Sequence, residues 1–202
     1  MNPSLSHIRR ALDQYSPRDL AESQELAHAA VALILREDHE TADQTEVLMI
    51  RRAEHPHDPW SGHMGFPGGR ADAQDESLER TAIRETKEEL GVCLDSCAER
   101  LGRLSELRAR SKMQALPLSI YPYICRLTKP APLELNHEVN EALWIPLEFF
   151  LSPENRDQME HPVDATRSVP CYRFRDHVIW GLSLAMLDEL VNVMQSGVPE
   201  NA

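Results

Sequence analysis

The segment from Gly68 to Val92 constrains this 202-residue chain more than any other. It reads GGRADAQDESLERTAIRETKEELGV and places Glu85, Glu88 and Glu89 in one predicted helix. Residues three and four positions apart lie on one face of a helix, so the three carboxylates share a face. Clustered carboxylates repel one another unless a positive charge lies among them. Such an oxygen-rich, rigidly presented cluster suits Mg²⁺ or Mn²⁺.

A helix rich in Glu, Lys and Arg is usually only a solvated surface. Here, however, Glu85 and Glu89 are like charges four positions apart, which weakens a helix that holds no cation. Lys87 points away from that face, and Arg84 is one candidate counterion. The sequence therefore favours a cation site over a plain exposed helix.

The same residues resemble the signature box of the Nudix hydrolases. That box runs Gly, five residues, Glu, seven residues, then Arg-Glu-apolar-x-Glu-Glu-x-Gly-apolar. This chain matches at Glu76, Arg84-Glu85, Glu88-Glu89, Gly91 and Val92. Two positions depart from the pattern: six residues rather than five separate Gly69 from Glu76, and Thr86 fills a position that is usually apolar. Loops absorb an extra residue more easily than helices do, and many family members with coenzyme A-like substrates carry it.

The resemblance implies an α/β fold, a Nudix-type α/β/α sandwich around a mixed β-sheet. It also implies that Glu85, Glu88 and Glu89 bind Mg²⁺ or Mn²⁺, together with the backbone carbonyl of Gly69. Arg84 belongs to the same catalytic set and is better placed to orient a carboxylate by a two-point pair than to bind substrate. Glu76 is expected to be structural. Asp75 or Ser77 is expected to cap the box helix, and Gly91 to end it. The general base is left open between a box glutamate and a later one.

Two further segments are similar to the coenzyme A pyrophosphatase subgroup. Upstream, Arg52, Gly62 and the run 66–69 (FPGG) match it, whereas Asp58 stands where that pattern has a second Arg. Downstream, the run 179–182 (IWGL) resembles the subgroup's closing helix. Candidates to replace the missing cation are Arg51, His55, His57 and His63, although these histidines are equally well explained as loop-packing residues. The candidate substrate-binding set is Arg51, Arg52, His63, Phe66, Glu138 and Glu141, the last two being the later glutamates.

The expected activity is divalent-metal-dependent hydrolysis of the pyrophosphate bond in a nucleoside diphosphate derivative. Coenzyme A or an acyl-CoA-like molecule is the preferred substrate. Asp58 favours an alternative, an ADP-ribose or nucleotide-sugar pyrophosphatase. An alternative of another class is an inactive Nudix-like ligand-binding module. Such modules typically lose box glutamates, and this chain has all of them.

The charge balance of 33 acidic against 21 basic residues argues against a nucleic-acid polymer as partner, because that needs a basic face. The four cysteines form no CxxC pair and are expected to be reduced thiols. No stretch is long and apolar enough to span a membrane, and the N-terminus lacks an apolar signal-peptide core. We therefore expect a cytoplasmic protein with a small nucleotide substrate, and a homodimer is left open.

The predicted organisation is an N-terminal helical extension (1–26), a Nudix domain (27–195) and a C-terminal tail (196–202). Within the extension, Ser4 or Ser6 is expected to cap a short helix. Strands are predicted at 27–35, 46–51, 103–108, 116–127 and 141–145, with the first two forming a hairpin and Pro122 marking an edge or a bend. An ordered loop is predicted at 52–66, and helices at 146–151 and 177–194. Within the loop, Trp60 is expected to anchor the segment, with stacking on a base as the alternative.

Overall fold

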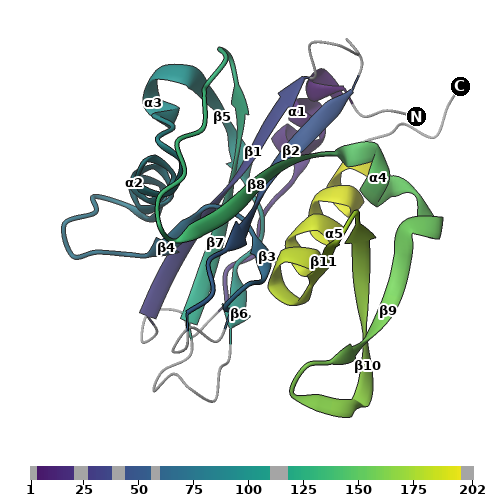
Figure 1. Cartoon of the computed structure of the whole chain (residues 1–202). Coiled ribbons are helices and arrows are strands. Elements are labelled where there is room, and N and C mark those ends of the chain that lie inside the picture. The colour runs from purple at the N-terminus through teal and green to yellow at the C-terminus, as the bar shows by residue number, and fades with distance from the viewer. Residues whose placement is uncertain (1–3, 21–26, 38–43, 56–59, 110–117, 197–202) are drawn as a thin grey trace, which may run out of the picture.

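The structure is a computed structural model that describes residues 4–20, 27–37, 44–55, 60–109 and 118–196. Figure 1 shows helices on both sides of a central sheet, with a second, smaller sheet beside it. In chain order the elements are α1 (Leu5–Gln14), β1 (Ala27–Glu37), β2 (Thr45–Arg52), β3 (Met64–Gly65), β4 (Gly68–Arg70), α2 (Leu78–Leu90), α3 (Leu94–Cys97), β5 (Ala98–Arg103), β6 (Leu107–Ala109), β7 (Leu118–Leu127), β8 (Val139–Pro146), α4 (Leu147–Leu151), a 3₁₀ turn (Pro153–Asn155), β9 (Arg156–His161), β10 (Asp164–Phe174), β11 (His177–Trp180) and α5 (Gly181–Ser196).

The central sheet is mixed and divides into a fork. β1 runs parallel to β7 and antiparallel to β2, which confirms the predicted hairpin. β1 and β2 pair only near the hairpin turn, where Leu35 faces Val47. Farther from the turn, β4 pairs with β1 and β3 pairs with β2. The short connection from β3 to β4, residues 66–67, therefore lies between two strands that have moved apart, with a glycine on each side of it.

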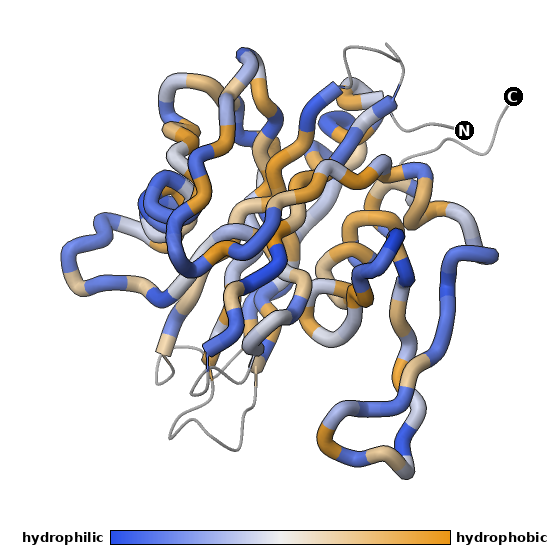
Figure 2. Tube along the Cα trace, viewed as in Figure 1, coloured by the Kyte–Doolittle hydropathy of each residue, from blue (hydrophilic) through white to orange (hydrophobic). Residues whose placement is uncertain are grey.

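Two hydrophobic layers cover the two faces of this sheet, as the α/β/α prediction requires. Alternate residues of β1 point to opposite faces. Ala30, Ala32 and Ile34 pack in a cluster with Ala82 and Leu90 of α2. Residues 29, 33 and 35 of β1 pack in the other cluster, with α1, α4 and α5. Figure 2 shows that hydrophobic residues concentrate along the central strands and α5, whereas the loop leading into α2 is hydrophilic. The predicted fold class is confirmed.

The N-terminal helix is part of this core. Ser4 caps α1 by accepting a hydrogen bond from the His7 N–H at 3.3 Å, so the first of the two predicted caps is used. Ile8 is completely buried, in the same cluster as the inner face of α5. Beyond the helix, the Tyr15 hydroxyl donates to the Glu189 carboxylate of α5. The described helix of the extension therefore packs on the body of the protein.

Pro122 marks an interruption in the neighbouring strand. The prediction that it marks an edge strand is wrong, because β7 has β1 on one side and β5 and β6 on the other. The Pro122 carbonyl accepts from the Leu104 N–H at 2.9 Å, so its hydrogen-free nitrogen faces the same side. On that side β5 ends at Arg103 and β6 begins at Leu107. The continuous strand predicted at 103–108 is therefore wrong.

The C-terminal region differs most from expectation. The helix predicted at 177–194 begins only at Gly181, because His177–Trp180 pair with β10 as strand β11. Strands β9 and β10, which the sequence does not predict, complete a three-stranded sheet. β9 has one apolar residue, Met159, and the first half of β10 is mainly polar, so neither shows the apolar alternation that predicts a strand, and most of their residues are exposed. No helix among the described residues has the length and apolar character needed to cross a bilayer.

Candidate active site

Helix α2 presents the box glutamates, and its ends are fixed by local sequence. Ser77 is the N-cap and accepts from the Arg80 N–H at 3.3 Å, and Gly91 ends the helix in the left-handed conformation. Both features are predicted from the sequence. Thr86 is buried, and its hydroxyl donates to the Ala82 carbonyl at 2.7 Å. A hydroxyl satisfied by its own helix accounts for a polar residue where the family pattern is apolar.

The glycine pair of β4 is required by close contacts on two sides. A Cβ on Gly68 would lie 2.3 Å from the Ala30 carbonyl oxygen, and its φ of +150° disfavours other residues. A Cβ on Gly69 would lie 2.5 Å from the carboxylate carbon of Glu85. The Glu85 carboxylate thus lies directly against the backbone of Gly69. One helical turn later, Glu89 Oε2 accepts from the Gly68 N–H at 2.8 Å. Two of the three predicted metal ligands are therefore held at one turn.

The environment of these two carboxylates disfavours their negative charge. Glu89 is only 1% exposed. Burial raises its pKa from 4.5 to about 7, against the opposing effects of its backbone hydrogen bond and the positive charge of Arg52. The charges of Glu85 and Glu138 raise it further. Burial also raises the pKa of Glu85, although the hydrogen bond from Arg84 opposes this. The site therefore contains a carboxylate that lacks full compensation of its charge.

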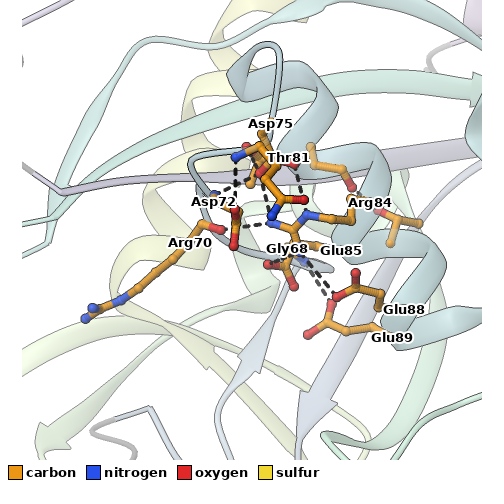
Figure 3. A network of polar contacts seen from close by, with 12 residues as sticks. Gly68, Arg70, Asp72, Asp75, Thr81, Arg84, Glu85, Glu88 and Glu89 are labelled. Carbon is orange, nitrogen blue, oxygen red and sulfur yellow. Dashed lines mark hydrogen bonds and ion pairs between the residues drawn. The ribbon is translucent and has the colours of Figure 1, made fainter.

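Arg84 organises the outer side of the site (Figure 3). Its Nε and Nη2 atoms donate to the two carboxylate oxygens of Asp75 at 3.0 and 2.9 Å. Its Nη1 donates to Glu85 at 2.9 Å and Glu88 at 3.2 Å, and Nη2 also reaches the Arg70 carbonyl at 3.1 Å. The Arg84 guanidinium, with backbone and Thr81 hydrogen bonds, holds the pKa of the Asp75 carboxyl well below its usual range. This geometry fits the predicted orienting role of Arg84.

Arg52 and Glu138 lie beside the box carboxylates. The charges of both act on Glu89, and that of Glu138 also acts on Glu85. The backbone links them, because the N–H of the next residue, Ala53, donates to the Glu138 carbonyl at 2.8 Å. Glu138 is exposed, so its side chain can meet a ligand at the surface. The structure thus brings two of the six candidate substrate-binding residues to the metal-ligand candidates.

The other four candidates lie elsewhere. Arg51 pairs with Glu141 across strands β2 and β8, and alternation turns both toward the α5 face of the sheet. Glu141 Oε2 lies 3.3 Å from His177 Nε2. Phe66 is 5% exposed and packs in the core beneath α5, so it presents little surface to a substrate. His63 precedes β3, and its ring contacts Trp180. Of the remaining candidates to replace the missing second Arg, His55 is exposed and His57 lies outside the described residues, as does Asp58, which stands at the position of that Arg.

The donor set fits a hard divalent cation. Glu85 and Glu89 supply oxygens at a glycine turn that a Cβ would block, and the buried charge of Glu89 has no full counterion. In the part of the chain that the structure describes, no three His, Cys, Asp or Glu side chains form a ready-made ion site. Arg84 instead donates to one oxygen of Glu85 and one of Glu88.

Two functional contacts were missed by sequence reasoning. Asp75 is expected only as a possible helix cap, yet it is the main partner of Arg84. The signal was available, since a partly buried guanidinium that must be oriented needs an acidic partner of its own. His177 as the partner of Glu141 had no signal, because the sequence places it in a helix rather than in β11.

Comparison with known proteins places the chain in a family. The NUDIX domain model matches residues 26–165. A peroxisomal coenzyme A diphosphatase of Caenorhabditis elegans is 31% identical over 180 residues, covering 84% of this chain and 71% of the relative. An uncharacterized protein of Schizosaccharomyces pombe is 36% identical over 126 residues, or 61% of this chain, but the match spans only 38% of that relative.

Solved structures agree on the fold. A MutT/nudix family protein from Enterococcus faecalis superimposes with a TM-score of 0.56 at 19% identity, covering 97% of this chain and 75% of that one. A C. elegans Ap4A hydrolase superimposes with a TM-score of 0.53 at 21% identity, covering 85% and 99%. At these identities the likeness concerns the fold alone. Together with the family match and the geometry of the box, it shows that the chain belongs to the Nudix hydrolases.

Proposed function

We propose that this Nudix hydrolase cleaves the pyrophosphate bond of a nucleoside diphosphate derivative, using Mg²⁺ or Mn²⁺ held by Glu85, Glu88, Glu89 and the Gly69 carbonyl. One observation carries the proposal. The Glu85 carboxylate packs against Gly69 while Glu89 accepts a hydrogen bond from the Gly68 N–H, so two acidic side chains are fixed at one backbone turn. A carboxylate buried at this cost without a cation is more easily explained by a ligand role than by stability.

The chemistry divides between ion and protein. When bound, the divalent ion neutralises diphosphate oxygens and acidifies a water molecule for attack on phosphorus. Arg84 holds Glu85 and Glu88 in place from the Asp75 side, so their oxygens are presented in a fixed direction. Arg52, whose positive charge acts on Glu89, is the candidate to contact a phosphate oxygen. The residues thus position charge before the reaction begins.

For the general base, we favour Glu138 among the later glutamates. Its carboxylate is exposed, and its charge acts on both Glu85 and Glu89. Glu141 instead pairs with His177 on the α5 face. We expect Glu138→Gln to lower kcat by about 10²- to 10⁴-fold, and Glu141→Gln to lower it far less. Equal losses in the two variants would exclude this assignment.

For the substrate, we favour coenzyme A or an acyl-CoA. The support is the C. elegans relative, which is named a coenzyme A diphosphatase and matches 84% of this chain. The substitution of Asp58 for the expected Arg keeps an ADP-ribose or nucleotide-sugar substrate as the second candidate. The same relative is named peroxisomal. Our expectation for this chain is the cytoplasm, and a fluorescent fusion imaged against a peroxisomal marker distinguishes the two.

The test is a substrate panel with matched variants. Purified protein is incubated with Mg²⁺ or Mn²⁺ and coenzyme A, ADP-ribose, a nucleotide sugar, a dinucleoside polyphosphate or a nucleoside triphosphate. Cleavage between the phosphorus atoms of a diphosphate gives two monophosphates, which mass spectrometry identifies, and ¹⁸O-water shows which phosphorus is attacked. Glu85→Gln should abolish turnover. Glu79→Gln, on the same helix but paired with Arg100, should not change it. Ligand binding with no product from any substrate would favour the inactive-module alternative.

A further inference from the structure

Three aromatic side chains from separate segments meet at Trp180. The His63 ring, just before β3, lies 5.1 Å from the indole, and the His161 ring, at the end of β9, lies 5.6 Å from it. The ring planes are inclined by 63° and 84°, so both imidazoles meet the indole edge to face. All three side chains are partly exposed. Trp180 therefore has two imidazole neighbours and some indole surface in contact with solvent.

The aromatic cluster (His63, His161 and Trp180) is connected to the carboxylate site through the backbone. The His63 carbonyl accepts from the Arg52 N–H at 3.0 Å, and the charge of Arg52 acts on Glu89. On the other side, Ser183 Oγ, in the first turn of α5, donates to the Met64 carbonyl at 2.8 Å, which fixes α5 beside β3. β3 is thus shared by the two sites. The hydrogen bond from Arg52 to His63 therefore joins the aromatic cluster to the residue whose charge acts on Glu89.

We propose that the aromatic cluster is the nucleobase site of the enzyme, with the base stacked on the Trp180 indole and its edges facing the two imidazoles. This inference rests on the proposed function and adds where the nucleoside half of the substrate binds. Every base has a π-face, so stacking on an indole does not depend on which hydrogen-bonding groups the base carries. Imidazoles can donate to or accept from ring nitrogens of the base, which adds selectivity for a nucleoside over a plain sugar.

The other two tryptophans of the chain fit this role less well. Trp60 packs against the hydrophobic core beneath α5, as expected for a residue that anchors its loop. Trp144 is on β8, and the Arg36 guanidinium lies 4.1 Å from the centre of its ring. Trp144 pairs with Leu48 near the hairpin end of β2, away from β3. Trp144 therefore provides a matched control.

The test measures binding of AMP to metal-free protein, so that it does not depend on hydrolysis. Calorimetry compares wild type with Trp180→Leu, which keeps apolar bulk, and Trp180→Phe, which keeps a π-face. We expect Trp180→Leu to weaken AMP binding by about fivefold to a hundredfold, Trp180→Phe by clearly less, and Trp144→Leu not at all. Ribose 5-phosphate, which lacks a base, should bind wild type and Trp180→Leu equally. Equal AMP affinity in all four proteins, or no measurable AMP binding by wild type, would overturn the inference.

A second measurement covers the case in which Trp180→Leu does not fold. In a Trp60→Phe, Trp144→Phe double variant, Trp180 is the only indole, and AMP should quench its fluorescence while ribose 5-phosphate should not. Absence of quenching at AMP concentrations that saturate the calorimetric signal would also overturn the inference. The two proposals fail separately. AMP binding that depends on Trp180 with no diphosphate hydrolysed would exclude the proposed function, whereas hydrolysis with Trp180-independent AMP binding would exclude only the base site.

Discussion

Replacing Glu89 by Gln removes its charge while keeping its shape, and this should stabilise the metal-free protein. Glu89 is buried, and its pKa is raised from 4.5 to about 7 in the folded state. Protonated Glu89 therefore contributes fully to stability below about pH 4.5, and the contribution is lost as the pH rises through about 7. The glutamine carbonyl can still accept from the Gly68 N–H. The variant thus lacks only the cost of burying a charge.

The size of the effect follows from the two pKa values. Their difference makes Glu89→Gln more stable than wild type by about 3 kcal/mol at pH 8 but by only about 1 kcal/mol at pH 5. Urea unfolding in chelator at several pH values measures this gap, and taking the difference between two proteins cancels the effect of the net charge of −12. Glu88→Gln is the control, because the Glu88 side chain is 54% exposed. A gap that is constant or grows toward low pH would refute the reasoning.

The same pair of proteins tests the ligand role. A cation that binds the folded state raises its stability by mass action. Millimolar Mg²⁺ or Mn²⁺ should therefore stabilise wild type at pH 8 and stabilise Glu89→Gln much less. With metal present, the difference in free energy of unfolding between Glu89→Gln and wild type should therefore become smaller or change sign. Equal stabilisation of both by the metal would remove Glu89 from the ligand set, although the pH dependence in chelator would stand.

Three other substitutions, one of them with a matched control, separate close contacts from general packing. Gly69→Ala places a Cβ 2.5 Å from the Glu85 carboxylate and should lower kcat by about a hundredfold in steady-state kinetics. The control is Gly65→Ala, whose Cβ would lie 3.8 Å from its nearest contact, Ser183 Oγ, and which should leave kcat nearly unchanged. Arg84→Lys keeps the positive charge but loses the two-point pair with Asp75. We expect kcat to fall about tenfold or more, and an unchanged kcat would contradict the orienting role. Tyr15→Phe deletes the hydroxyl that joins the N-terminal segment to α5 and should lower the free energy of unfolding by about 1 kcal/mol in urea, with no effect on KM.

The fold around the box was predictable because local chemistry there agrees with the tertiary structure. Ser77 and Gly91 end the helix where capping rules place them. The continuous apolar run that begins at Ala27 is a strand covered on both faces, which is why it lacks an alternating pattern. The three glutamates share a helix face, as their spacing requires. In each case the signal lies within a few residues of the feature that it predicts.

The features that were not predicted depend on partners far away in the chain. The break between β5 and β6 is set by Pro122 on another strand. The first residues of the expected C-terminal helix become β11 only because β10 lies beside them, and Gly181, with φ of +64°, lets the chain turn into α5. The separation of Arg51 from Arg52 onto opposite faces follows from strand alternation. Sequence alone could not show which of the two faces carries the box.

The fork between β1 and β2 explains why the glycine pair of β4 cannot be moved elsewhere in this fold. At the hairpin end the two strands pair directly, and no third backbone fits between them. Where they separate, β3 and β4 satisfy the hydrogen bonds that the strands would otherwise lose. Of the Gly68 groups, the N–H remains for Glu89, while close approach to Ala30 excludes any side chain. The turn that completes the sheet therefore also supplies the backbone N–H that holds the buried Glu89 carboxylate. A substitution that moves this turn would disturb both the pairing of β4 with β1 and the hydrogen bond to Glu89.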